Sequence, residues 1–516
     1  MKIGIYYVLI LALCVTCSRR DNSIGTQVQT RAGVVEGIAE QSGVIAFKGI
    51  PFAAPPTGDL RWKEPQPVKP WEGVKKTVAF GPSPMQGAPR PFYMWSREFL
   101  IPDEPISEDC LYLNVWTPAK TINDKMPVLV WIYGGGFTSG GSAVPIYDGE
   151  ALASKGIVFV SINYRVGVLG FMAHPELTKE SPHGVSGNYG LLDQIAALRW
   201  VQENIRAFGG DPANVTIAGQ SAGSMSVVSL VASPLTKGLF NKAIAQSGAG
   251  LLKGSPSARG FRDLKEAEAE GLQATGDTLS LADLRAMTAM EVFEKIKGRS
   301  GPIVDGYVLP ESLPDVFLNK KENDVTLLTG WNEEEGFLFG APKTAAEFTE
   351  SIKRDYGTDA RELLIHYPAN NDTEAMASQL ALSRDIVFGG PNYMLANMMS
   401  NHGQKVFVYR FTKKVPGTGE FAKFGAFHTG EVPYALDVLK FSDRPWQPVD
   451  HELAKTMSAY WVNFVKSGDP NGEGLPEWPA YSVRSKKIIN FSDEVAAKDL
   501  PDSLALDFLT SKLFPR

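Results

Sequence analysis

Ser221 stands at the centre of a short pattern, Gly219-Gln-Ser-Ala-Gly223, that can present a serine for nucleophilic attack. The apolar residues 215–218 before it predict a strand, and the small residues 224–232 after it predict a helix. A serine at a sharp strand-to-helix turn exposes its hydroxyl, and the flanking glycines remove side chains that would collide there. The first amide groups of the helix can stabilise a developing negative charge. The segment therefore predicts a nucleophilic serine.

A serine hydroxyl needs a base to take its proton, and His428 is the best-placed candidate for that base. Where such a turn supplies the nucleophile, the chain order is serine, acid and then histidine. His428 lies on a predicted loop after the strand expected at residues 405–411, where a mobile base would be expected. The other histidines precede the serine or fall in or beside predicted helices: His174, His183, His366, His402 and His451.

The acid that orients the base is expected in the run Glu333-Glu334-Glu335, which follows a predicted strand at residues 324–330. Adjacent glutamates usually form a solvated charged surface, and two of these are expected to do so. Glu335 is the preferred acid because Gly336 lets the chain turn back tightly toward the site. The residues alone do not separate Glu334 from Glu335.

Three consecutive glycines can supply the donors that stabilise a tetrahedral intermediate. Such an intermediate needs backbone N–H groups directed at its oxyanion. The strand expected at residues 127–133 leads into Gly134-Gly135-Gly136, where the absence of side chains lets amide groups approach a substrate. We expect the donors to be Gly135, Gly136 and Ala222, the residue that follows the serine.

The composition is that of a folded globular protein: 516 residues, 44% hydrophobic and 21% charged, with a formal net charge of −6. The negative balance argues against a nucleic-acid partner. No phosphate-loop, dinucleotide-binding or zinc-ligand spacing occurs in the sequence, so we expect no metal and no organic cofactor. Because no linker, charge block or repeat divides the chain, residues 26–514 are expected to form a single catalytic domain.

Residues 1–17 have the pattern of an export signal. Lys2 precedes the apolar run 3–15, which is shorter than the roughly 20 residues that a membrane-spanning helix needs. Cys17 lies after this run, so a lipid anchor at Cys17 is one expectation and a plain cleaved signal is the other. The protein would be periplasmic, an outer-membrane lipoprotein or secreted. Cys110 would then be a lone thiol that cannot form an internal disulfide, so packing must stabilise the fold.

Predicted strands and helices alternate along the chain. Strands are expected at residues 34–38 and 44–50, as an antiparallel hairpin, and at 111–116, 127–133, 157–163, 215–218, 241–247, 324–330 and 405–411. Helices are expected at residues 191–208 and 224–232 and over much of 264–296, 345–354, 372–386 and 451–465. The alternation predicts an α/β fold with a large, mostly parallel central sheet and helices on both faces. In such a sheet the site lies at the carboxyl ends of the strands.

Further segments match a known family pattern: Lys48-Gly-Ile-Pro-Phe-Ala, Ser107-Glu-Asp-Cys-Leu-Tyr-Leu-Asn114, Gly187-Asn-Tyr-Gly-Leu-Leu-Asp-Gln194 and Tyr460-Trp-Val-Asn-Phe-Val-Lys-Ser-Gly-Asp-Pro-Asn471. With the segment around Ser221, they make the chain resemble the type B carboxylesterase/lipase family, whose animal members include the cholinesterases. The resemblance covers essentially residues 26–514. It implies the α/β-hydrolase fold and, with the export signal, a bacterial exported member.

The resemblance also implies a Ser-His-Glu triad of Ser221, His428 and Glu335, which assigns the acid that the residues alone left open. It implies two structural ion pairs: Arg61 with Glu108, and Arg165 with Asp193. The expected activity is hydrolysis of small-molecule carboxylic esters through an acyl-enzyme intermediate. A lipase, a thioesterase or a polysaccharide-deacylating esterase on the same machinery is the alternative. A non-catalytic, cholinesterase-like adhesion protein is disfavoured because every triad residue is present.

Departures from the family pattern bear on the substrate. The cysteine that pairs with the position of Cys110 in eukaryotic members is missing from residues 80–86, so this loop is expected to be unpinned. Gln220 stands where animal cholinesterases carry a glutamate, which removes a charge attractive to cationic substrates. Their acyl-pocket phenylalanines map near Gly298 and Ser300, so a roomier acyl side is expected. The aromatic candidates for the pocket wall, with core packing as the alternative, are Trp95, Phe137, Phe337, Phe339 and Phe427.

Overall fold

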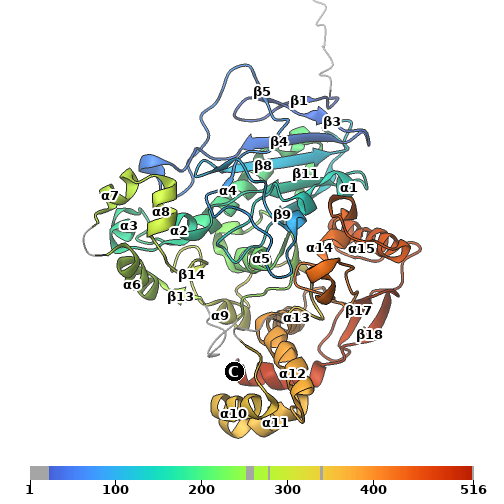
Figure 1. The fold of residues 1–516 in the computed structure, drawn as a ribbon. Helices are drawn as coiled ribbons and strands as arrows, with labels where there is room; N and C mark the ends of the chain where they lie inside the picture. Colours follow the sequence, from blue (N-terminus) through green and yellow to red (C-terminus); the bar gives the residue numbers. More distant parts are fainter. Residues whose placement is uncertain (1–21, 252–260, 277–278, 337–340, 514–516) are drawn as a thin grey trace, which may run out of the picture.

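The computed structural model describes residues 22–251, 261–276, 279–336 and 341–513, and a large sheet runs through its centre (Figure 1). The strands of this sheet are β3 (Ile38–Ala39), β4 (Ile45–Pro51), β8 (Tyr112–Thr117), β9 (Met126–Ile132), β10 (Val158–Ile162), β11 (Gly210–Gln220), β12 (Lys242–Gln246), β15 (Thr326–Asn332), β16 (Val406–Phe411), β17 (Lys487–Phe491) and β18 (Ala496–Asp499). Within the described ranges it is an 11-stranded sheet in the order β18-β17-β16-β15-β12-β11-β9-β10-β8-β4-β3. Neighbours from β17 to β10 are parallel, and the edge strands are antiparallel.

Shorter strands lie outside the large sheet: β1 (Gln27–Gln29), β2 (Val34–Glu36), β5 (Val74–Lys76), β6 (Ser83–Pro84), β7 (Ile106–Ser107), β13 (Arg262–Asp263) and β14 (Ile303–Val304). The α-helices are α1 (Glu150–Ala153), α2 (Gly167–Phe171), α3 (Pro175–Glu180), α4 (Tyr189–Asn204), α5 (Ala222–Ala232), α6 (Leu264–Thr275), α7 (Leu281–Ala286), α8 (Ala289–Lys295), α9 (Leu313–Leu318), α10 (Ala345–Tyr356), α11 (Ala360–His366), α12 (Asp372–Arg384), α13 (Gly390–Asn401), α14 (Val432–Ala435), α15 (Pro448–Ser467) and α16 (Ser503–Leu513). Among the described residues, none of these helices combines the length and apolar character needed to cross a membrane.

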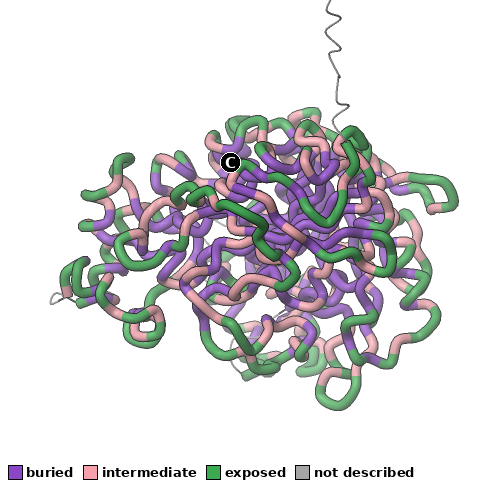
Figure 2. Tube along the Cα trace, turned by 90° about the horizontal axis from the view of Figure 1, so that it is seen from above, coloured by how far each residue is buried: buried purple, intermediate pink, exposed green. Residues whose placement is uncertain are grey.

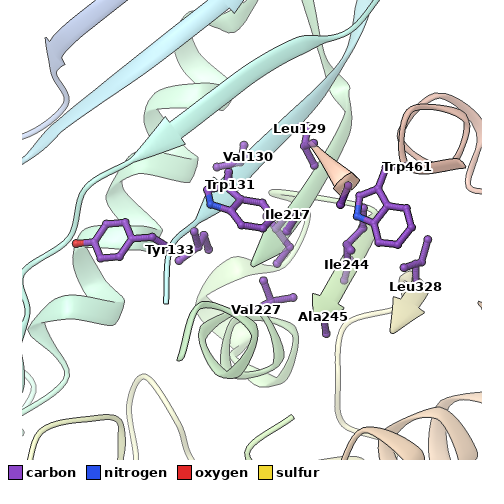
Figure 3. Close-up of a cluster of buried hydrophobic side chains, with 14 of the residues drawn as sticks. Leu129, Val130, Trp131, Tyr133, Ile217, Val227, Ile244, Ala245, Leu328 and Trp461 are labelled. Atoms are coloured by element: carbon purple, nitrogen blue, oxygen red, sulfur yellow. The ribbon is translucent and has the colours of Figure 1, made fainter. Parts of the chain in front are cut away.

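Helices cover both faces of the sheet, which follows from the register of the parallel strands. One row of paired residues on one face contains Trp131, Ala218, Ile244 and Leu328. Figure 3 shows Trp461 of α15 beside Ile244, whereas Val227 of α5 lies beside Ile217, whose side chain belongs to the opposite face. Strands that are buried on both faces read as continuous apolar runs, and the centre of the molecule is buried (Figure 2). The predicted fold class is confirmed.

The carboxyl ends of three parallel strands bring the expected site together. β11 leads directly into Ser221, β9 leads into the glycine run 134–136, and β15 leads into the glutamate run 333–335. Because β9, β11, β12 and β15 are consecutive parallel neighbours, these ends lie at one edge of the sheet.

The hairpin expected at residues 34–38 and 44–50 is only partly correct. β2 pairs with β1 and β5 in a separate sheet, and only β3 pairs with β4 as an antiparallel hairpin. The chain changes sheets at Gly37, whose N–H donates to the carbonyl oxygen of Thr26. A side chain at Gly37 would meet the carbonyl oxygen of Ala46, so the backbone there approaches β4 too closely for any residue with a Cβ.

Candidate active site

The predicted strand, turn and helix around Ser221 are present. β11 ends one residue before the serine and α5 begins one residue after it, and Ser221 has φ of 59° and ψ of −125°. A Cβ at Gly219 would meet the backbone of Gly223, and a Cβ at Gly223 would meet the carbonyl oxygen of Ile132. The positive φ and the close packing explain why the turn is strained and flanked by glycines. The serine is half-buried and lines a cavity.

His428 and Glu335 meet in the interior of the protein. Glu335 Oε2 lies 2.8 Å from His428 Nδ1, and the two side chains are 0% and 3% exposed respectively. The other carboxylate oxygen, Oε1, accepts a 2.8 Å hydrogen bond from the backbone N–H of Asn332, at the end of β15. With Nδ1 facing the carboxylate, Nε2 is the ring nitrogen that remains for proton transfer. Ser221 and His428 line the same cavity.

Glu333 and Glu334 are the two solvent-accessible glutamates of the run, as expected, but each is also bound to other parts of the protein. Glu333 forms ion pairs of 3.0 Å with Arg384 and 2.9 Å with Arg410, whose guanidinium groups are buried. Burial raises the pKa of Glu333, but Arg410 and Arg384 together hold it below its ordinary value. Because its carboxylate is committed to these two cations, Glu333 anchors the loop that carries Glu335.

Glu334 is exposed, yet it is bound to the loop that carries His428. Its Oε2 accepts a 2.6 Å hydrogen bond from the backbone N–H of Ala426, and its own N–H donates to the carbonyl oxygen of Ala426. The run therefore holds two loops in register, and each glutamate has a different partner.

Uncharged groups enclose the imidazole of His428 on its remaining sides. The ring of Phe388 stacks on it, with centroids 4.3 Å apart and planes inclined by 23°. The side-chain nitrogen of Gln220 lies 3.3 Å from both ring nitrogens, and its Oε1 accepts a 3.3 Å hydrogen bond from the hydroxyl of Thr429. Trp95 meets the imidazole in an edge-to-face contact, with centroids 6.3 Å apart. These neighbours fix the orientation of the ring.

The glycine run after β9 presents backbone amides at the cavity. Gly135 and Gly136 have φ of 117° and 62°, in the region that favours glycine. A Cβ at Gly135 would meet the carbonyl oxygen of Ser139. Within the described part of the chain, no acceptor is found for the N–H groups of Gly135, Gly136 and Ala222. Unpaired donors beside a strained serine are suited to binding an oxyanion.

A cavity of about 700 Å³ contains both the serine and the histidine in its wall. Its larger apolar lining residues are Phe92, Trp95, Phe99, Leu100, Ile101, Val144, Tyr147 and Phe388. Trp95 therefore lies in the expected wall. Phe137 does not line this cavity, because its ring is buried and packs against Phe171 with centroids 5.2 Å apart. Phe427 is likewise a core residue, and Phe337 and Phe339 lie outside the described residues.

The loop at residues 80–86 is pinned although it lacks a cysteine, contrary to the sequence-based expectation. The side-chain amide of Gln86 donates to the carbonyl oxygen of Gly140 at 2.7 Å and accepts from the N–H of Gly140 at 2.8 Å. β6 in this loop also pairs with β7. Cys110 is a buried free thiol, so paired hydrogen bonds replace the disulfide of the eukaryotic pattern.

Both ion pairs implied by the resemblance are present and buried. Arg61 donates to the two carboxylate oxygens of Glu108 at 2.6 and 2.7 Å, and Arg165 donates to those of Asp193 at 2.8 and 2.7 Å. Such bidentate contacts fix geometry more than they add net stability. They hold the segments around the cavity in place.

Sequence reasoning missed Glu431, which is fully buried close behind the Glu335 carboxylate. Its Oε2 accepts a 2.6 Å hydrogen bond from the side-chain amide of Asn332, and its Oε1 accepts one of 3.2 Å from Gln246. Burial, followed by the charge of Glu335, raises the pKa of Glu431 to about 7. Its position three residues after His428 gives only a weak indication that it belongs to the site, because its burial depends on the tertiary structure.

Known proteins with similar sequences include enzymes that cleave esters. A family model described as "Carboxylesterase family" matches residues 25–509. The chain belongs to the carboxylesterase family. This carboxylesterase is 40% identical over 488 residues to the fumonisin B1 esterase of Sphingopyxis macrogoltabida, an alignment that covers 91% of the chain and 86% of that protein.

Other relatives match along nearly their whole length. The para-nitrobenzyl esterase of Bacillus subtilis is 36% identical over 512 residues, covering 95% of this chain and 98% of that protein. A crystal structure of a Geobacillus stearothermophilus carboxylesterase matches with a TM-score of 0.79 at 33% identity, covering 94% of this chain and 100% of that one. This carboxylesterase thus has the α/β-hydrolase fold and is a serine carboxylesterase that hydrolyses carboxylic esters.

Proposed function

We propose that this carboxylesterase cleaves small-molecule esters with Ser221 as the nucleophile, His428 as the general base and Glu335 as the carboxylate that orients the base. The observation that carries the proposal is the buried 2.8 Å contact between Glu335 Oε2 and His428 Nδ1, beside the cavity that Ser221 lines. A base held at Nδ1 by a carboxylate keeps Nε2 free to accept the proton of a serine hydroxyl.

The reaction then has two half-reactions. His428 Nε2 takes the proton of Ser221 as the serine oxygen attacks the ester carbonyl carbon, and Glu335 stabilises the imidazolium that forms. The tetrahedral intermediate collapses, the carbon–oxygen bond to the alcohol breaks, and His428 returns the proton to the departing alkoxide. Water attacks the acyl-serine by the same steps and releases the carboxylic acid.

The oxyanion is held by the N–H groups of Gly135, Gly136 and Ala222 in this proposal. These donors have no acceptor among the described residues, so no internal hydrogen bond must break when the oxyanion forms. Ala222 is the first residue of α5, where the helix dipole adds a favourable field for negative charge.

The decisive experiment replaces the nucleophile. The Ser221→Ala variant is expected to lose at least about 10³-fold in kcat toward 4-nitrophenyl butyrate, because no acyl-enzyme can form. A fluorophosphonate probe should label the native protein and leave this variant unlabelled. Labelling of a folded Ser221→Ala variant, or its full activity, would refute the assignment.

Ser224→Ala is the matched control. Ser224 lies on the same helix, is buried, and its hydroxyl has no hydrogen-bond partner among the described residues. Its removal should leave both labelling and turnover close to those of the native protein.

Export remains a proposal that rests on the sequence of residues 1–17, which lie outside the described residues. The basic residue, the apolar run and Cys17 support a signal that is cleaved, with or without lipid attachment. Expression in a Gram-negative host, followed by fractionation and mass spectrometry of the N-terminus, distinguishes the two forms. A protein that keeps Met1 and stays in the cytoplasm would contradict export.

A further inference from the structure

The cavity that holds Ser221 has a neutral wall with one fixed positive charge. Among the described residues that line it, Arg90 is the one with a permanent charge, because a guanidinium group stays protonated at any pH near neutrality. The remaining lining is apolar, aromatic, glycine or uncharged polar, apart from His428. A lone cation at the wall of an otherwise neutral cavity favours a ligand group of opposite charge.

Arg90 is free to bind such a group. Its side chain is exposed, and no hydrogen bond or ion pair joins it to any residue in the described ranges. Other arginines near the cavity are committed: Arg97 pairs with Asp103, and Arg444 pairs with Glu98. A guanidinium group binds a carboxylate through two parallel N–H donors, and Arg90 has all of its donors available.

Two further cations lie on aromatic rings that pack next to the segment 87–93, which contributes to the cavity wall. The ring of Phe293 packs against Gly87, a cavity residue, and Lys297 Nζ lies 4.8 Å from the centre of that ring. Phe424 packs against Tyr93 with centroids 5.2 Å apart, and Lys423 Nζ lies 5.2 Å from the centre of the Phe424 ring. Lys297 Nζ also donates a 2.7 Å hydrogen bond to the carbonyl oxygen of Phe293, which leaves its charge without a carboxylate partner among the described residues. These two lysines add positive charge near the cavity, where the exposed Glu334 carboxylate already binds the Ala426 N–H.

We propose that the physiological substrate is an anionic ester, one whose acyl or alcohol half carries a further carboxylate, and that Arg90 binds this carboxylate. The inference rests on the proposed function, because it names the substrate class of the same site. Lys297 and Lys423 contribute by raising the local concentration of anions, an effect that salt screens. Gln220, which stands where animal cholinesterases carry a glutamate, is consistent with an anionic substrate, because a neutral side chain does not repel an anion.

The test compares esters that differ by one carboxylate. On the acyl side the pair is 4-nitrophenyl pentanoate and the mono-4-nitrophenyl ester of glutarate; on the alcohol side it is phenyl pentanoate and 4-carboxyphenyl pentanoate. For at least one pair, Arg90→Gln should lower kcat/KM for the charged ester about tenfold, mainly through KM, and leave the neutral ester unchanged. Arg90→Lys should retain part of the preference, and 0.5 M NaCl should weaken it.

Arg354→Gln is the matched control, because Arg354 is an exposed arginine on α10 that pairs with Asp355. It removes the same charge and should change neither ester of a pair. The inference is overturned if Arg90→Gln affects charged and neutral esters equally, or affects neither, in both pairs.

Binding separates this inference from the proposed function. Glutarate should bind to the Ser221→Ala variant, detected by calorimetry, and bind about tenfold more weakly when Arg90→Gln is added. This readout needs no turnover. Hydrolysis that survives Ser221→Ala would refute the proposed function, whereas equal glutarate binding by both proteins would refute only the anion site.

Discussion

The side-chain nitrogen of Gln220 lies 3.3 Å from both ring nitrogens of His428, so the amide sits over the face of the imidazole rather than at one nitrogen in its plane. Phe388 stacks on the same ring at a centroid distance of 4.3 Å, and two groups cannot share one face at these distances. The imidazole is therefore held between an amide and a phenyl ring, while Glu335 holds its Nδ1.

Gln220→Glu should move the acid limb of the pH–rate profile to higher pH. A carboxylate beside the ring favours the protonated imidazolium, which cannot accept the serine proton. We expect the midpoint of kcat/KM for a neutral ester to shift upward by roughly one pH unit relative to the native protein. A profile that superimposes on the native one would show that Gln220 does not influence the base.

The three adjacent glutamates should respond differently to the same substitution. Glu335→Gln removes the carboxylate at His428 Nδ1, so kcat should fall by about 10³–10⁴-fold while the protein stays folded. Glu334→Gln should have a small effect on kcat, because it exchanges one carboxylate contact to the Ala426 N–H at an exposed position.

Glu333→Gln should act on stability instead of chemistry. It leaves the buried guanidinium groups of Arg384 and Arg410 without one of their anions, so the free energy of unfolding should fall by about 1–3 kcal/mol. Urea denaturation and steady-state kinetics on all three variants separate these roles. An equal loss of kcat in all three variants would contradict these separate roles of Glu333, Glu334 and Glu335.

Local sequence was sufficient where a function depends on consecutive residues. The turn at Ser221 and the glycines at 135 and 136 were predictable, because a strained backbone and a close approach require particular residues at particular positions. The burial of Glu431 was not predictable, because its partners Gln246 and Asn332 come from β12 and β15, which are distant in the sequence. The ion pairs of Glu333 were not predictable for the same reason, because its partners Arg384 and Arg410 come from distant segments.

Gly135→Ala should damage the oxyanion-binding loop selectively. The native φ of 117° disfavours alanine, and its Cβ would clash with the carbonyl oxygen of Ser139, so the loop must move. Loss of one oxyanion donor costs about 10²–10³-fold in kcat, and KM should change less. Gly403→Ala is the control for backbone strain alone, because Gly403 has φ of 86° with open space around it. If both variants keep native kcat, Gly135 is not an oxyanion donor.

Glu431 should make the protein less stable as the pH rises toward neutrality. In the folded state its carboxyl group keeps the proton up to a pKa of about 7, whereas an unfolded glutamate releases it near 4.5. Between these values the folded state binds more protons, so the free energy of unfolding falls with increasing pH, by on the order of 3 kcal/mol for this group. The contribution is complete below pH 4.5 and is lost above about pH 7.

Glu431→Gln should remove this part of the pH dependence. The amide is uncharged at every pH, so the difference in unfolding free energy between pH 5 and pH 8 should be smaller in the variant than in the native protein. Urea denaturation at the two pH values measures it, and the comparison is unaffected by a constant cost from the altered hydrogen bonds to Asn332 and Gln246. Glu362→Gln, at an exposed glutamate on α11, is the control and should leave the pH dependence unchanged. The same pH dependence in the Glu431 variant and the native protein would mean that Glu431 is already ionised at pH 5, and the buried carboxyl would then be a permanent second negative charge behind the histidine.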